Sequence, residues 1–238
     1  MKKYATITAL TAQQLDWCHR TISSDALAAI TLHNLATETP CSIVRAADGE
    51  QCIIAYAHGA PLRRFLTDPD WLVRFGMPDT DLKQVAENLI RAGNEATYYA
   101  PSISGLYKSK YNLYQYFQDR QEFADVFYHR EWKERGWLDV MLPDTNILVL
   151  HGQPEHVKAA LIENFGCRRI ETCEVHSWKD HDAVRRAVEK STAQLVLGSV
   201  GPVGKYLLVE LARDYGKVVL DVGNGMLKSW CKSITAGH

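Results

Sequence analysis

The sequence predicts an α/β protein with a mostly parallel β-sheet and helices on both faces. From residue 145 onward, short apolar runs alternate with segments of helical periodicity, which favours right-handed βαβ units. The chain has 238 residues, of which 46% are hydrophobic, and a net charge of −1. This length suits one large domain, and the composition excludes an intrinsically disordered chain.

The first 40 residues are predicted to be helical. One segment runs through Leu15 and Trp17, and Asp25 can cap a second segment that ends before Pro40. We therefore expect an N-terminal helical segment at residues 1–40, followed by a single domain at residues 41–238.

The first strand is predicted at residues 41–45. The polar Asp48-Gly49-Glu50 follows it, and a second apolar run covers residues 52–56. Asp81 opens an amphipathic helix, and residues 98–100 form a probable strand.

The C-terminal half contains the regular alternation. Pro154 starts a helix that ends near Gly166, and Gly216 closes the last helix. The expected strands lie at residues 146–150, 168–175, 194–198 and 217–221, and the later helices at residues 180–190 and 203–215.

The near-balance of charge disfavours bulk attraction to a nucleic-acid backbone. We expect no membrane span, and the scattered cysteines are typical of reduced thiols in a cytoplasmic protein. Four residues resemble a loose zinc set, although core packing is the favoured explanation: Cys167, Cys173, His176 and His181.

Residues 198–205 read Gly-Ser-Val-Gly-Pro-Val-Gly-Lys between a predicted strand and helix. Glycines there allow a ligand to approach the backbone, and the start of the helix can bind phosphate. The spacing matches neither the dinucleotide fingerprint nor the Walker A motif, so a nucleotide diphosphate is the ligand we expect. A tight turn without a ligand is the alternative.

A second segment, at residues 219–225, places Asp221 and Gly223 at the end of the last strand. It is similar to the first motif of S-adenosylmethionine methyltransferases, but only residues 226–238 follow it, which disfavours that class. Ligands of parallel sheets bind beyond the carboxyl ends of the strands. The two glycine-containing segments are therefore expected to border one crevice.

A third segment places Arg45, Asp48 and Glu50 at the end of the first strand. Two carboxylates spaced i, i+2 can reach one hard cation, Mn²⁺ or Mg²⁺, which would bridge a diphosphate. Arg45 offers a fork for phosphate. For Asp48-Gly49-Glu50 taken alone, a β-turn is the favoured alternative.

Together these segments resemble the GT-D-fold glycosyltransferases. The N-terminal match follows the pattern S-x-V-R-x-x-D-G-E through Ser42, Val44, Arg45, Asp48, Gly49 and Glu50. The C-terminal match follows L-G-x-x-G-P-x-x-K-x-L and D-x-G through Leu197, Gly201, Pro202, Lys205, Asp221 and Gly223.

The resemblance implies a Rossmann-like domain that transfers a sugar from a nucleotide-sugar donor, with a UDP-sugar expected, to an acceptor hydroxyl. It implies a D-x-E motif, Asp48 and Glu50, that holds the metal and the donor diphosphate. Arg45, Gly201, Gly204, Lys205 and Gly223 are the expected donor-binding residues. If the reaction inverts, the general base is expected among Asp221, Glu50 and His129.

The acceptor is expected to be a saccharide, a glycopeptide or modified DNA. The tyrosine-rich stretch from Tyr98 to Tyr116, with Lys108 and Lys110 interleaved, is a candidate platform for it, and packing of these aromatic residues on the sheet is the alternative. A non-catalytic nucleotide- or nucleic-acid-binding protein with the same fold is the second functional hypothesis.

Overall fold

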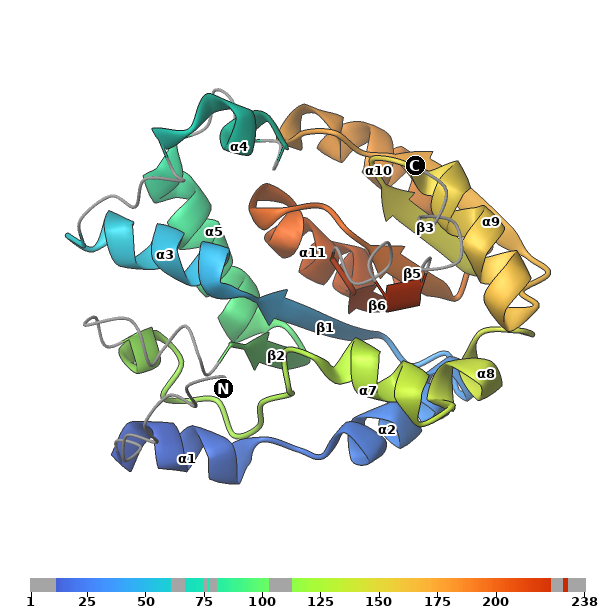
Figure 1. Ribbon diagram of the computed structural model, residues 1–238, viewed down its shortest axis with the longest axis horizontal. Coiled ribbons are helices and arrows are strands. Elements are labelled where there is room, and N and C mark those ends of the chain that lie inside the picture. The colour runs from blue at the N-terminus through green and yellow to red at the C-terminus, as the bar shows by residue number, and fades with distance from the viewer. Residues whose placement is uncertain are drawn as a thin grey trace, which may run out of the picture.

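The computed structural model describes residues 12–60, 67–74, 77, 81–102, 113–223 and 229–230. Its six strands form one sheet (Figure 1). The strands are β1 (Cys41–Ala46), β2 (Tyr98–Pro101), β3 (Ile147–His151), β4 (Ile170–Glu174), β5 (Leu195–Gly198) and β6 (Val218–Asp221).

Helices separate most of these strands along the chain. The α-helices are α1 (Ala12–Arg20), α2 (Ser24–Ala36), α3 (Asp48–Ala57), α4 (Pro69–Arg74), α5 (Leu82–Glu95), α7 (Tyr128–Glu134), α8 (Trp137–Met141), α9 (Pro154–Phe165), α10 (His181–Lys190) and α11 (Lys205–Tyr215). Short 3-10 segments are η2 (Leu113–Tyr116), η3 (Trp178–Asp180) and η4 (Pro202–Gly204).

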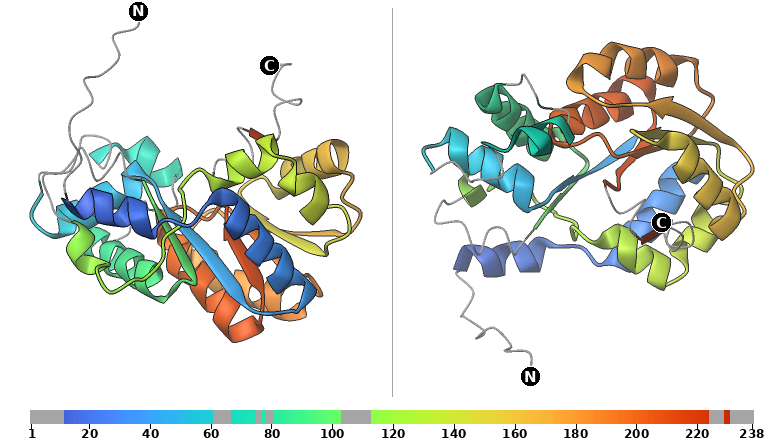
Figure 2. Two further views of the ribbon diagram at one scale, coloured as in Figure 1. Left: turned by 90° about the horizontal axis from the view of Figure 1, so that it is seen from below. Right: turned by 45° about the horizontal axis from the view of Figure 1, so that its top comes forward.

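The strand order is β2-β1-β6-β5-β3-β4, and every recorded pair is parallel. Helices α2, α7, α8 and α9 contribute to one buried cluster with the sheet, whereas α10 and α11 contribute to another (Figure 2). The predicted α/β fold, with a parallel sheet and helices on both faces, is therefore confirmed.

The crossovers change direction between β3 and β5. The chain leaves β3 through α9 toward the outer strand β4, and it leaves β5 through α11 toward β6 on the other side. Helices α9 and α11 belong to clusters on opposite faces. Such a switch point leaves a crevice at the carboxyl ends of the two strands, which is where parallel sheets bind ligands.

The described part of the N-terminal segment is helical, as predicted, but the N-cap of α2 is Ser23 and not the predicted Asp25. The hydroxyl of Ser23 accepts a hydrogen bond from the amide of Ala26 at 3.1 Å, and Asp25 lies in the first turn. Three residues of α2, Leu27, Ala28 and Leu35, pack in the same cluster as the sheet. The division of the chain at residue 40 stays a prediction.

The segment after β1 differs more from expectation. Asp48 to Ala57 is one helix, α3, so the turn expected as the alternative for Asp48-Gly49-Glu50 is wrong. Glu50 reaches back and its Oε2 accepts a hydrogen bond from the amide of Ala47 at 3.1 Å, which closes the first helical turn. Ile53 and Ile54 then bury in a cluster shared with α5.

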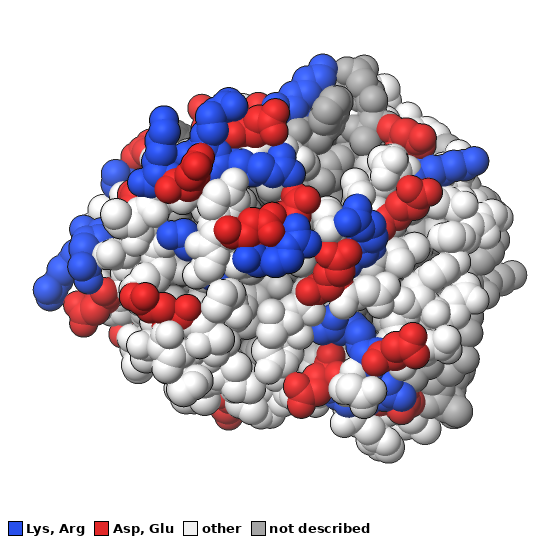
Figure 3. Space-filling model, turned by 180° about the vertical axis from the view of Figure 1, so that it is seen from behind, with Lys and Arg blue, Asp and Glu red and all other residues white. Residues whose placement is uncertain are grey.

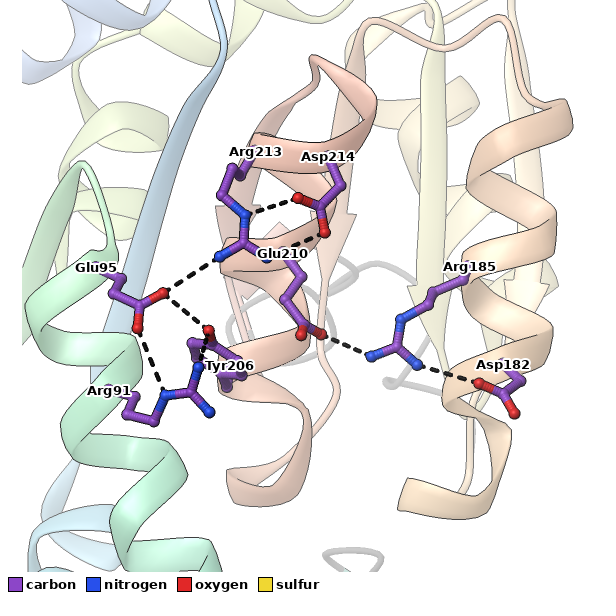
Figure 4. Close-up of polar contacts among 8 residues, drawn as sticks. All are labelled: Arg91, Glu95, Asp182, Arg185, Tyr206, Glu210, Arg213 and Asp214. Carbon is purple, nitrogen blue, oxygen red and sulfur yellow. Dashed lines mark hydrogen bonds and ion pairs between the residues drawn. The ribbon is translucent and has the colours of Figure 1, made fainter.

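A polar network joins α5, α11 and α10 at the surface (Figure 4). The Tyr206 hydroxyl accepts a hydrogen bond from Arg91 and donates one to Glu95 Oε2 at 2.8 Å. On the other side of α11, Glu210 pairs with Arg185 of α10 at 2.7 Å. Helix α11 is therefore tied to both of its neighbours while its inner face packs on the sheet.

None of the helices in the described residues is long and apolar enough to cross a membrane.

Candidate functional site

The carboxyl ends of β1 and β6 meet the start of α11, where three buried charged side chains converge. Lys205 Nζ lies 2.5 Å from Asp221 Oδ2 and 3.3 Å from Glu50 Oε1. The side chains of Asp221, Lys205 and Glu50 are 0%, 6% and 11% exposed. Burial of unpaired charges would be costly, so the three groups compensate one another.

Arg45 completes this cluster from β1. Its backbone amide donates to Asp221 Oδ2 at 2.9 Å. Its guanidinium donates through Nε to the carbonyl of Val126 at 2.7 Å and through Nη1 to the carbonyl of Val222 at 2.9 Å. Arg45 therefore ties the segment before α7 to the end of β6. We call Arg45, Glu50, Lys205 and Asp221 the buried charge cluster.

The predicted glycines shape the backbone around this cluster. Gly201 has φ +63° and Gly223 has φ +49°, in the region that favours glycine. A Cβ atom on Gly223 would lie 2.9 Å from Arg45 Nη1, and one on Gly204 would lie 2.4 Å from a methyl carbon of Val200. Gly201 is thus explained by its backbone conformation, Gly204 by its packing, and Gly223 by both.

The two carboxylates of the D-x-E motif have different surroundings. Asp48 is exposed, and its Oδ1 accepts a hydrogen bond from the Ser102 hydroxyl at 2.9 Å. Glu50 is buried and uses its oxygens for the Ala47 amide and for Lys205. Positions i and i+2 of a helix do not face each other.

This arrangement fits a divalent cation only in part. An exposed carboxylate such as Asp48 is a suitable hard oxygen ligand. The oxygens of Glu50 are already engaged by Lys205 and a backbone amide, so Glu50 would join Asp48 at one ion only after leaving Lys205. Among the described residues no group of three or more His, Cys, Asp or Glu side chains is arranged to hold a metal.

His129, in α7, is fully buried, and neither ring nitrogen has a hydrogen-bond partner in the part of the chain that the structure describes. Burial, followed by the positive charges of Arg45, Arg130 and Lys205, lowers the pKa of His129 from 6.5 to about 2. The imidazole is therefore neutral at physiological pH. Asp221 Oδ1 is likewise buried without a recorded partner.

The loose zinc set is not assembled among the described residues. Cys167 is a core residue whose pKa burial raises to about 11, and His176 Nε2 lies 2.8 Å from Glu174 Oε1. The core alternative for Cys167 is therefore the one observed.

The tyrosine-rich stretch is described only at its ends, because residues 103–112, with Lys108 and Lys110, lie outside the described residues. Tyr99 packs in the core cluster of α3 and α5, as its packing alternative predicted. Figure 3 shows basic and acidic side chains interspersed on the face opposite to Figure 1. The described part of that face therefore offers no extended basic patch for a nucleic-acid backbone.

A family model described as a GT-D fold-like domain matches residues 22–229. The chain belongs to the GT-D-like family. The match covers both motif regions that carried the resemblance, together with the sheet and the buried charge cluster between them. Searches of curated proteins and of solved structures gave no match.

Two further residues lie at the carboxyl edge of this GT-D-like sheet and were not identified from the sequence. The Tyr128 hydroxyl donates to the backbone carbonyl of Asp221 at 3.0 Å. His151 ends β3 and is 5% exposed. His151 could have been identified from the sequence, because it is a polar residue that directly follows the apolar run at residues 147–150.

Proposed function

We propose that this GT-D-like protein is a metal-dependent glycosyltransferase that moves a sugar from a nucleotide-diphosphate sugar, with a UDP-sugar expected, to an acceptor hydroxyl. The observation that carries the proposal is the buried charge cluster at the carboxyl edge of a GT-D-like sheet. The acceptor class stays as predicted, a saccharide, a glycopeptide or modified DNA, and the expected location is the cytoplasm.

Charge balance supports a role for a metal ion. The cluster contains two carboxylates, Glu50 and Asp221, and two cations, and Lys205 is the cation that contacts both carboxylates. A diphosphate brings further negative charge, which this balanced cluster does not neutralise. Asp48, exposed at the start of α3, would hold Mn²⁺ or Mg²⁺, with Glu50 as a second ligand if it leaves Lys205. When bound, the ion would supply positive charge to the departing diphosphate.

The residues of the chain itself have separate roles in this proposal. The backbone of Gly201 and Gly204 at the start of α11 would bind and orient the donor, and Lys205 would contact it only after leaving Asp221 and Glu50. Arg45 and Gly223 would keep the ends of β1 and β6 in place beside it. The second role agrees with the contacts of the Arg45 guanidinium, which binds backbone carbonyls of two segments.

The surroundings of His129 disfavour it as the general base of the reaction. His129 is a poor base, because burial, followed by the positive charges of Arg45, Arg130 and Lys205, lowers its pKa to about 2. For an inverting reaction we propose that Asp221 or Glu50 accepts the proton of the acceptor hydroxyl. Asp221 Oδ1 has no hydrogen-bond partner among the described residues, so this oxygen is available to accept the proton.

Turnover of nucleotide sugars tests the proposal. The full chain is incubated with a panel of nucleotide sugars and Mn²⁺, Mg²⁺ or EDTA, and release of the nucleoside diphosphate is measured. Asp48→Asn should lower turnover by about a hundredfold or more, and the exposed Glu87→Gln of α5 should leave it unchanged. Turnover that survives both EDTA and Asp48→Asn would contradict the metal assignment.

The turnover assay, combined with measurements of ligand binding, distinguishes the proposed enzyme from a non-catalytic binding protein. A non-catalytic nucleotide-binding protein would show a rise in melting temperature with nucleoside diphosphates, yet no turnover of any donor with either metal. A nucleic-acid-binding protein would instead bind DNA with a steep dependence on salt.

A further inference from the structure

The carboxyl ends of β3 and β5, at the switch point of the sheet, carry two polar side chains to which the proposed reaction assigns no role. By the two-residue period of strands, His151 lies on the same face as Val149, and Ser199 on the same face as Leu197. Val149 and Leu197 are paired neighbours in the cluster that α9 covers. His151 and Ser199 are thus side by side at the carboxyl edge, near the start of α9.

The ring of His151 is held in one tautomer. Its Nδ1 accepts a hydrogen bond from the amide of Gln153, the N-cap of α9, at 2.8 Å. The proton of the neutral ring therefore resides on Nε2, which is a donor without a partner among the described residues. Burial and the neighbouring His156 lower the pKa of His151, so the neutral ring persists at physiological pH.

Ser199 adds a second donor beside it. Its amide donates to the carbonyl of Leu150 at 2.9 Å, which fixes the backbone, while no partner for its half-buried hydroxyl is found within the described ranges. The helix that begins here, α9, has 12 residues and directs its free amides toward the same edge. A buried histidine donor, a hydroxyl and a helix start thus lie at the same edge of the sheet, and the described part of the chain supplies no acceptor for the two side-chain donors.

The position of these donors relates them to the buried charge cluster. His151 and Asp221 end strands β3 and β6, which are separated by β5. Two strand spacings correspond to roughly 10 Å, a span that one nucleotide diphosphate can bridge. The donors at β3 are uncharged, whereas the charged groups lie at β1, β6 and α11. Uncharged donors match the neutral oxygen acceptors of a ribose or a base better than they match a phosphate.

We propose that His151 Nε2 and Ser199 Oγ bind the nucleoside half of the donor, by donating hydrogen bonds to oxygen acceptors of its ribose or base. This inference rests on the proposed function, and it assigns a subsite at β3 and β5 in which His151 lies outside both motif regions and Ser199 occupies a variable position of the C-terminal one. His151 acts in it as a specificity-determining residue.

A pair of variants separates the Nε2 donor from the structural role of the ring. His151→Asn keeps an acceptor at the position of Nδ1 for the Gln153 amide but removes the Nε2 donor. His151→Gln places an amide donor near the position of Nε2. The exposed His33→Gln, on α2, is the matched control.

Binding is measured by titration calorimetry on the full chain with UDP, GDP, ADP, CDP and inorganic pyrophosphate, each with Mn²⁺. For the preferred nucleotide, we expect His151→Asn and Ser199→Ala each to weaken binding about fivefold to tenfold, the usual effect of one lost hydrogen bond. His151→Gln should retain more affinity than His151→Asn. The affinity for pyrophosphate should be the same in all of these variants.

Three outcomes would overturn the inference. Unchanged nucleotide binding by His151→Asn would remove His151 from the site. A parallel loss for pyrophosphate would place His151 at the phosphates instead. If the wild-type chain bound none of the nucleotides, this inference and the proposed function would fail together, whereas the first two outcomes leave the proposed function intact.

Discussion

The buried imidazole of His129 should make the stability of the protein depend on pH in a defined window. Its pKa is about 2 in the folded state, against about 6.5 in an unfolded chain. Between these values the unfolded state binds a proton that the folded state excludes, so stability falls as the pH decreases below about 6.5. Above that pH the neutral ring is common to both states and the effect disappears.

The size of the effect follows from the same two values. At pH 5, protonation of the unfolded histidine should cost the folded state about 2 kcal/mol, and at pH 7.5 only about 0.1 kcal/mol. The perturbation is His129→Leu, which removes the titrating group and fills a similar volume. Urea denaturation at both pH values should show a pH-induced loss that is about 2 kcal/mol smaller in the variant than in the wild type.

Burial also lowers the pKa of His151 and His181, so these rings contribute to the pH dependence as well. Their contribution is the same in wild type and variant, and the difference between the two proteins reports His129 alone. His33→Gln, at an exposed position of α2, should keep the wild-type response. Equal pH-induced losses in wild type and His129→Leu would refute the reasoning, since they would mean that the ring binds its proton equally in both states.

Three further outcomes test the packing around the site. Lys205→Met should lower the free energy of unfolding by about 3–5 kcal/mol, because it leaves Glu50 and Asp221 buried without their cation. The control Lys158→Met breaks an exposed ion pair and should change the free energy of unfolding by less than about 1 kcal/mol. Gly198→Ala should lower the free energy of unfolding by about 1–3 kcal/mol, because the new Cβ would lie 2.7 Å from Leu208 Cδ2. In the double variant with Leu208→Ala, the loss of stability measured by urea denaturation should be smaller than the sum of the losses in the two single variants. Tyr206→Phe should cost about 1 kcal/mol by removing the hydroxyl between Arg91 and Glu95, and thermal unfolding that matches wild type would show that this network contributes nothing.

The sequence was sufficient to predict the C-terminal half of the fold. Strands β3, β5 and β6 are apolar runs, and Gly166 and Gly216 end helices in the left-handed conformation that favours glycine. These signals are local, so they do not depend on the rest of the chain. The predicted strand at residues 168–175 was longer than the observed β4, Ile170–Glu174.

The conformation of the D-x-E segment could not be read in the same way. Asp48-Gly49 has the composition of a turn, yet the segment forms the first turn of α3. The helix there is favoured by the contact of Glu50 with the Ala47 amide and by burial of Ile53 and Ile54 against α5. The packing against α5 involves residues far away in the sequence, so a local interpretation of residues 48–50 does not contain it.

The contents of the candidate site were predicted better than its geometry. The sequence placed Arg45, Glu50, Lys205 and Asp221 at the carboxyl ends of strands, but a Gly-Lys pair after a loop suggested a lysine that faces a ligand. Instead, Lys205 turns inward to Asp221. That orientation depends on the fully buried carboxylate of Asp221, and no periodicity in the sequence reports it.

The strand order explains why two motifs at opposite ends of the chain can form one site. Strand β6 inserts between β1 and β5, so the amide of Arg45 reaches the side chain of Asp221 although the two residues are 176 positions apart. The middle of the chain contributes β2, which lies outside β1, and β3 and β4, which lie beyond β5. This middle region also supplies the Val126 carbonyl, which binds the Arg45 guanidinium, and the Tyr128 hydroxyl, which binds the Asp221 carbonyl. The buried charge cluster itself is complete only when the last strand has docked, because Asp221 supplies the carboxylate that balances both Lys205 and the β1 amide. Folding and assembly of the site are thus one event in this arrangement, and a variant that weakens the docking of β6 should lose donor binding and stability together.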